Sequence, residues 1–168
     1  MGGSGGSGTF ISRIDVSRLE NIARGELTKP PPAPRRKIFL SFRVEDLDRV
    51  NLFRGQAKNE NSDLDFIDYS LRAPFNSENA EYIKRGIRER IKQSSVTVIL
   101  VSKETHKSEW VDWEIRESIR LGKGVVAVKL EDDPSMKYPK ALEEHGIQPV
   151  SWNHKIIRDA IDNATENR

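Results

Sequence analysis

A short apolar run, VTVILV at residues 96–101, restricts the fold of this chain more than any other segment. It is interrupted only by Thr97 and is far too short to span a membrane, so it fits a strand that is buried on both faces of a sheet. A helical pattern precedes it, because Ile83, Ile87 and Ile91 recur at helical spacing. An amphipathic helix that leads into a fully buried strand is typical of an α/β fold.

The same alternation of strand and helix patterns continues along the chain. The predicted strands are 37–42 (KIFLSF), 64–70 (LDFIDYS), 96–102 (VTVILVS) and 124–130 (GVVAVKL), with 148–152 (QPVSW) as a short fifth candidate. The predicted helices are 45–59, 76–93 with Ser77 as its N-cap, 109–121 closed by Gly122, and 155–165. This order predicts a flavodoxin-like three-layer sandwich around a central parallel sheet of four to five strands.

The N-terminal part of the chain differs in character. Residues 1–8, MGGSGGSG, are typical of a flexible expression linker. Residues 9–36 hold a weak helical pattern followed by a proline-rich spacer, KPPPAPRR. The apolar residues of the pattern share one helical face: Val16, Leu19, Ile22 and Ala23. We expect the folded domain to span residues 37–168.

Composition argues against several classes of function. The 28 basic and 26 acidic residues are interspersed and sum to a formal charge of +2, so no basic surface for nucleic acid or an anionic membrane is predicted. The chain has no cysteine and only three scattered histidines, which predict neither a disulfide framework nor a metal site. No apolar signal-peptide core is present at the N-terminus. We therefore expect a cytoplasmic protein without a bound metal or cofactor.

The segment THKSEWVDWEI at residues 105–115 gathers aromatic and acidic residues at the start of a predicted helix. Its apolar stripe, which includes Val111 and Ile115, must face the sheet. Trp113 lies nearly opposite, where we expect it to contact a second protomer or the terminal segments. Trp110 and Glu114 share the border of the stripe, near the carboxyl ends of the strands, where α/β proteins bind ligands.

Glu114 has two structural interpretations and one functional one. The residues one turn away from it are Trp, Val, Glu and Ser, so no cation on the helix explains it as an ion pair. A second structural interpretation is interaction with the helix dipole, which Glu109 and Asp112 already supply. A reactive carboxylate near the strand ends is the functional alternative.

Four segments together resemble the Toll/interleukin-1 receptor (TIR) domain, in which a strand leads through a loop to a W-x-x-x-E helix: KIFLSF, a strand ending in DYS, VTVILVS and SEWVDWEI. The chain is most similar to the ThsB-type TIR-like subfamily of bacterial Thoeris antiphage systems, which has GQAKN-like, DWS-like and THKSxWVxWEI-like segments. The resemblance covers about residues 37–130. Tyr69 stands where the subfamily often has Trp, and RAPFNSEN lacks the proline-glycine tip of classical TIR loops.

The resemblance implies an enzyme that cleaves NAD+ as its substrate, releases nicotinamide and makes a cyclic ADP-ribose-type signal in antiphage defence. By its match to the motif, Glu114 is the carboxylate that stabilises positive charge on the ribosyl carbon as neutral nicotinamide leaves. The substrate-binding candidates lie at the strand ends and in the loop before the helix: Ser41, Phe42, Arg43, Asp68, Tyr69, Ser70, Thr105, His106 and Trp110.

Several of these candidates also have structural interpretations. Trp110 and Phe42 fit the edge of the core, Asp68 fits a turn cap, and Arg43 and His106 fit a solvated surface. Two other functions stay open for the whole chain: a noncatalytic TIR scaffold that signals by self-association, and a flavodoxin-like nucleotide-binding domain, although no glycine-rich phosphate loop is present. As a TIR-like enzyme, the protein is expected to self-associate and to reach a downstream effector through a diffusible nucleotide.

Overall fold

The computed structural model describes residues 13–28, 36–59, 64–67 and 73–167. The chain divides into two units, residues 1–33 and 34–168. The first unit holds helix α1 (Arg13–Thr28), which confirms the weak helical pattern near the N-terminus. Val16, Leu19 and Ile22 of α1 are all exposed. The side chain of Ala23, the fourth residue of the predicted face, lies outside the described residues.

The second unit is built on a parallel four-stranded sheet in the order β2-β1-β3-β4. Its strands are β1 (Arg36–Ser41), β2 (Leu64–Ile67), β3 (Val96–Val101) and β4 (Gly124–Lys129). The predicted fifth strand is reduced to a single parallel bridge between Val128 and Val150. Pro149 precedes that bridge and has no N–H with which to extend the ladder. The flavodoxin-like α/β prediction is confirmed.

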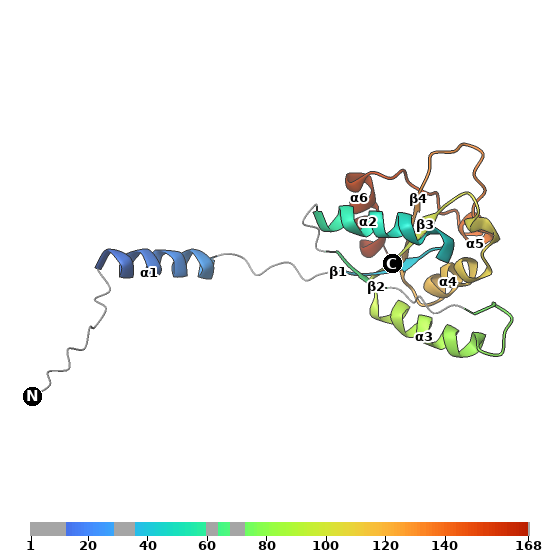
Figure 1. Cartoon of the computed structure of the whole chain (residues 1–168), viewed down its shortest axis with the longest axis horizontal. Coiled ribbons are helices and arrows are strands. Elements are labelled where there is room, and N and C mark those ends of the chain that lie inside the picture. The colour runs from blue at the N-terminus through green and yellow to red at the C-terminus, as the bar shows by residue number, and fades with distance from the viewer. Residues whose placement is uncertain (1–12, 29–35, 60–63, 68–72, 168) are drawn as a thin grey trace, which may run out of the picture. The chain divides into compact units, whose positions relative to one another are not determined.

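Helices cover both faces of the sheet. They are α2 (Leu47–Asn59), α3 (Ala80–Gln93), α4 (Glu109–Arg120), α5 (Lys140–Glu144) and α6 (His154–Glu166), with two 3-10 turns, η1 (Val44–Asp46) and η2 (Thr105–Lys107). Figure 1 shows α2 and α6 on one side of the sheet and α3, α4 and α5 on the other. The result is the expected three-layer sandwich.

Strand β3 shows why its apolar run is continuous. Val96, Val98 and Leu100 pack with residues of α2 and α6, whereas Ile99 and Val101 pack with residues of α4 and α5. Because successive side chains of a strand point to opposite faces, a strand covered on both sides must be apolar at nearly every position. Thr97 is also fully buried and uses its hydroxyl in a hydrogen bond.

Two details of the helices differ from the prediction. Helix α3 begins at Ala80 with Asn79 as its N-cap, so the assignment of Ser77 as the cap is wrong. The chain turns before α3, where Ser77 N donates to Pro74 O, and this turn delays the start of the helix. The sequence also did not predict α5, a single short helix after Pro139. Gly122, by contrast, has a φ of 68° just after α4, as expected of a C-terminal glycine. None of the described helices combines the length and apolar character needed to cross a bilayer.

Candidate functional site

Helix α4 carries Glu114 to the edge of the sheet where the strands end. Its N-cap is Ser108, whose hydroxyl accepts a hydrogen bond from Val111 N at 3.3 Å. Val111 and Ile115 are buried against the sheet, as the apolar stripe predicts. Glu114 is itself 0% exposed, and the Ser41 hydroxyl at the end of β1 donates a hydrogen bond to its Oε2. The carboxylate is therefore buried more deeply than its place at the border of the stripe suggested.

A second hydroxyl fixes the main chain of the same residue. Ser118 Oγ donates to the Glu114 carbonyl oxygen at 2.7 Å and lies 2.8 Å from Thr97 Oγ1 on β3. Ser118 and Thr97 are both fully buried. Helix α4 is thus joined to β1 through the Glu114 side chain and to β3 through the Ser118 side chain.

Trp110, one turn before Glu114, forms a partly buried aromatic wall. Its indole N–H donates to Ala73 O at 2.8 Å, which ties the segment before α3 to α4. Its ring meets Phe75 edge-to-face at 5.0 Å and Trp113 at 6.2 Å between centroids. Trp113 is partly buried against α3 and is not fully exposed on the outer face: Lys84 Nζ and Arg88 Cζ each lie 5.7 Å from the centroid of its ring. Its contact with a second protomer or the terminal segments stays a prediction.

Glu117, the other buried glutamate of α4, joins this helix to α3. Its carboxylate accepts hydrogen bonds from Arg120 Nη2 at 2.5 Å and from Arg88 Nε at 2.6 Å. The hydrogen bond from Arg120, and after it that from Arg88, lower the pKa of Glu117 to about 2, against the opposing effect of burial. Arg88 also lies over the Trp113 ring, so its ion pair with Glu117 keeps the guanidinium next to that ring.

A cavity of about 440 Å³ opens beside Trp110, within the size range of small-molecule sites. It brings together three predicted site residues: Phe42, Arg43 and Trp110. The other lining residues are Val44, Glu45, Ala73, Pro74, Phe75, Lys107, Ser108 and Glu109. The Arg43 guanidinium lies 3.3 Å from the Glu45 carboxylate, and the Arg54 guanidinium lies 5.8 Å from the centroid of the Phe42 ring.

The remaining predicted residues lie elsewhere or are not described. Thr105 is fully buried, and its Oγ1 accepts a hydrogen bond from Ser102 N at 2.8 Å, so it shapes the loop after β3. His106 Nδ1 lies 2.9 Å from Lys103 O, and the residue lines a neighbouring hollow of about 380 Å³ with Phe75 and Trp113. The residues at 68–70, namely Asp68, Tyr69 and Ser70, lie outside the described residues. Their contact with a substrate stays a prediction.

The sequence did not single out Phe75 or Lys107, although both line the cavity. Phe75 lies in an irregular segment whose path cannot be read from periodicity, and Lys107 is one of many lysines in a charged chain. The sequence does contain one indication for Phe75. It is a large aromatic residue in an otherwise polar segment, RAPFNSEN, and such a residue usually packs against a partner.

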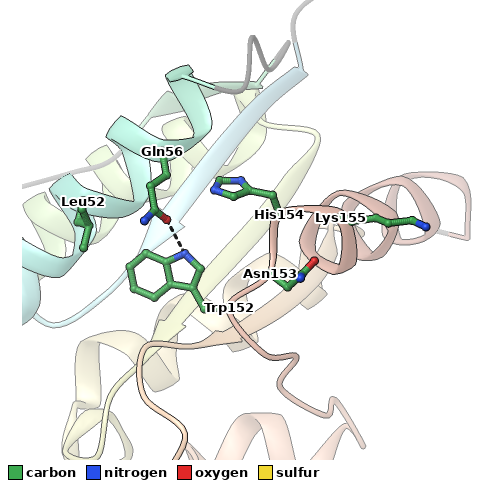
Figure 2. Close-up of a pocket in the computed structure, with 6 residues that line it drawn as sticks. All are labelled: Leu52, Gln56, Trp152, Asn153, His154 and Lys155. Atoms are coloured by element: carbon green, nitrogen blue, oxygen red, sulfur yellow. Dashed lines mark hydrogen bonds between the residues drawn. The ribbon is translucent and has the colours of Figure 1, made fainter.

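A second cavity, of about 560 Å³, lies between α2 and the start of α6 (Figure 2). The indole N–H of Trp152 donates to Gln56 Oε1 at 2.8 Å across it. Leu52, Asn153, His154 and Lys155 complete the lining. It shares no lining residue with the cavity beside Trp110.

The parallel order β2-β1-β3-β4, the helices on both faces and a W-x-x-x-E helix with its glutamate buried at the strand ends define a TIR-like α/β domain. The chain belongs to the family described as Thoeris protein ThsB, TIR-like domain, which matches residues 39–135. This match confirms the resemblance that the sequence motifs indicated.

Individual relatives are more distant. A Bacillus cereus (strain MSX-D12) protein, provisionally described as the cyclic ADP-D-ribose synthase ThsB1, is 28% identical over 99 residues. That alignment covers 56% of this chain and 52% of the relative, so the chain matches about half the length of that protein. Among solved structures, the TIR domain of the Toll-related receptor TRR-2 from Hydra magnipapillata has a TM-score of 0.48 at 15% identity, covering 75% of this chain and 91% of that one. A 2-deoxyribosyltransferase from Bacillus psychrosaccharolyticus has a TM-score of 0.48 at 15% identity, covering 79% and 92%.

Proposed function

We propose that this domain cleaves NAD+ at the bond between nicotinamide and ribose, with Glu114 as the catalytic carboxylate. One observation carries the proposal: a fully buried glutamate lies one helical turn after Trp110, which lines a cavity with Phe42, Phe75 and Arg43. Glu114 itself is not among the residues that line this cavity. When the bond breaks, its electron pair leaves with neutral nicotinamide, and positive charge develops on the ribosyl carbon. A carboxylate placed in advance stabilises that charge without protonating the leaving group.

The cavity residues suit the other parts of NAD+. Arg43 offers a guanidinium for charge-assisted hydrogen bonds to the pyrophosphate. Phe42 and Trp110 present apolar surfaces for the ribose and a base. Asp68 and Ser70, which follow β2 in the sequence, are proposed to bind ribose hydroxyls. The Thr105 hydroxyl is engaged by Ser102 within the loop after β3, and His106 lines the neighbouring hollow, so we assign them no contact with NAD+.

The proposed product is a cyclic ADP-ribose isomer. Once nicotinamide has left, the ribosyl cation reacts either with water or with an atom of the adenosine half of the same molecule. Exclusion of water and close placement favour the second route, since effective molarities of well-placed groups reach about 10⁵ M. Membership of the Thoeris family and the description of the Bacillus relative support this proposal. We further propose that the product acts in the cytoplasm as a diffusible signal to an effector in antiphage defence.

The decisive experiment is to incubate purified protein with NAD+ and to measure nicotinamide by chromatography. Glu114→Gln keeps the shape of the side chain and removes its charge, so release should fall roughly 10²-fold or more. Glu89→Gln is the matched control, because Glu89 is exposed and pairs with Lys92 on α3. A folded Glu114→Gln variant with full activity would disprove the catalytic assignment, and loss of folding would make Glu114 a structural residue.

Two further measurements test the product and the assembly. Mass spectrometry should show the cyclic isomer as a species one water lighter than ADP-ribose. If ADP-ribose is the only product, the protein is an NAD+ hydrolase and the proposed cyclisation is wrong. We also propose that the domain self-associates and that a second protomer completes the site. Nicotinamide release should then rise faster than linearly over a hundredfold range of protein concentration, whereas strictly proportional rates from a monomer would contradict self-association.

A further inference from the structure

Ser41 occupies a position that alternation along β1 determines. Leu40 and Phe42 pack with the residues of α2 and α6, whereas Phe39 packs with those of α3. Because strand side chains alternate between faces, Ser41 points to the same side as Phe39, toward α3 and α4. It pairs with Ile99 of the central strand β3 and is the last residue of β1. A hydroxyl is thereby placed opposite Glu114 by rigid backbone rather than by a loop.

The Ser41 hydroxyl is fully buried and donates to Glu114 Oε2. A serine hydroxyl has a single proton, and this one is directed to the Glu114 carboxylate, so it is not available to donate to a substrate. We propose that Ser41 is a positioning residue, which fixes the orientation of the Glu114 carboxylate and does not itself contact the substrate. This inference rests on the proposed function, in which that carboxylate stabilises the developing ribosyl cation.

The backbone contacts support the same role. Ser118, on the same helix, donates to the Glu114 carbonyl oxygen at 2.7 Å and is itself bonded to Thr97 on β3. Glu114 is thus linked to two neighbouring strands, directly to β1 through Ser41 and indirectly to β3 through Ser118. One contact fixes the helix and the other fixes the carboxylate. Electrostatic stabilisation of a transition state is largest when the charged group is held in place before the reaction, since no reorganisation is then needed.

Replacing Ser41 with Ala removes the donor and leaves the carboxylate in place. We expect kcat to fall about tenfold or more with KM for NAD+ unchanged within about twofold, because the lost interaction stabilises the transition state and not the bound substrate. A group that touched NAD+ in the ground state would raise KM instead. The loss of the donor also changes the surroundings of the Glu114 carboxyl, so its ¹³C chemical shift at a fixed pH should differ from that of the wild type.

The experiment combines kinetics with ¹³C NMR of the labelled Glu114 carboxyl in the full chain without NAD+. Ser94→Ala is the matched control: Ser94 is also buried, and its hydroxyl donates to Ile91 O at 2.7 Å, at the far end of α3. That variant should lose some thermal stability and keep both kcat and the ¹³C chemical shift of the Glu114 carboxyl. Ser41→Cys, which is close in shape and a weaker donor, should give a chemical shift between wild type and Ser41→Ala, and it serves if the Ala variant does not fold.

Each outcome bears on the proposal. An unchanged kcat and carboxyl ¹³C shift in Ser41→Ala overturns it, as does a raised KM with normal kcat. If the wild type releases no nicotinamide but the ¹³C shift of Glu114 still changes in Ser41→Ala, the proposed NAD+ cleavage fails while the positioning of Glu114 by Ser41 stands. If the wild type is active and Ser41→Ala moves neither quantity, only the positioning role fails.

Discussion

Two buried glutamates lie three residues apart on α4, and their surroundings differ. Glu117 is bound by two guanidinium groups, those of Arg120 and Arg88, which compensate its charge. Glu114 receives a hydroxyl hydrogen bond from Ser41. Burying a carboxylate is costly unless hydrogen bonds or opposite charges compensate it. The two guanidinium groups make Glu117 part of a structural ion pair between α4 and α3, whereas the Ser41 hydrogen bond ties the Glu114 carboxylate to the end of β1.

The Glu117 ion pair gives a prediction about pH and stability. Its folded-state pKa of about 2 lies below the unfolded value of 4.5, so its stabilisation is present above about pH 4.5 and is lost as pH falls toward 2. The shift corresponds to at most about 3 kcal/mol, reduced by the partial exposure of both arginines. Glu117→Gln should lower the free energy of unfolding in urea at pH 7, and its stability should fall less than that of wild type between pH 5 and pH 3.

Glu89→Gln again provides the comparison, since the exposed Glu89–Lys92 pair should contribute little at either pH. If Glu117→Gln lost as much stability on acidification as the wild type, the acid-labile contribution would have to lie in other carboxylates.

At the scale of elements, the strands could be predicted more reliably than the segments between them. The run at 96–101 fits a strand buried on both faces, and this interpretation located β3 correctly. Capping and periodicity also located Glu114 and Trp110 near a helix start and Phe42 and Arg43 at a strand end, while their roles toward a substrate stay predictions. The turn that delays α3 and the placement of Phe75 depend on tertiary contacts such as the Trp110–Ala73 hydrogen bond, which leave no periodic signal. The contact of Trp113 with Lys84 and Arg88 likewise depends on how α3 and α4 pack together.

Strand β4 and helix α6 approach each other closely at Gly124, and this contact gives a prediction. A Cβ on Gly124 would lie 2.2 Å from the Ala164 carbonyl oxygen and 2.8 Å from its carbon, both backbone atoms that cannot move aside alone. Gly124→Ala should therefore destabilise the domain by about 1–3 kcal/mol, as other overpacked sites do. The measurement is urea unfolding monitored by circular dichroism.

Gly55→Ala in α2 is the matched control for this substitution. No atom lies within 4 Å of the Cβ it would add, and alanine is favoured over glycine in a helix by up to about 1 kcal/mol. The same chemical change should thus have opposite signs at the two sites. A neutral Gly124→Ala would mean that α6 can shift away from β4 at little cost.

At the scale of the whole molecule, the folded core belongs to one unit. All three buried clusters of the described residues, and the residues packed against them, come from positions between Ile38 and Ala164. The start of β1 is joined to α6 by an ion pair between Arg36 and Asp162. These contacts lie within residues 34–168, and they include both sides of the sheet and the site around Glu114.

A chain shortened to residues 34–168 should therefore keep the fold. We expect its far-UV circular dichroism to change only by the loss of α1 and its thermal unfolding to remain a single cooperative transition at nearly the same temperature. A chain that begins at residue 42 is the informative contrast, because it lacks β1, which lies between β2 and β3 and carries Ser41. Removing an internal strand breaks both ladders and exposes the face that α3 and α4 cover, so this shorter chain should not fold. A 34–168 chain without a cooperative transition would show that residues 1–33 contribute to the stability of the domain.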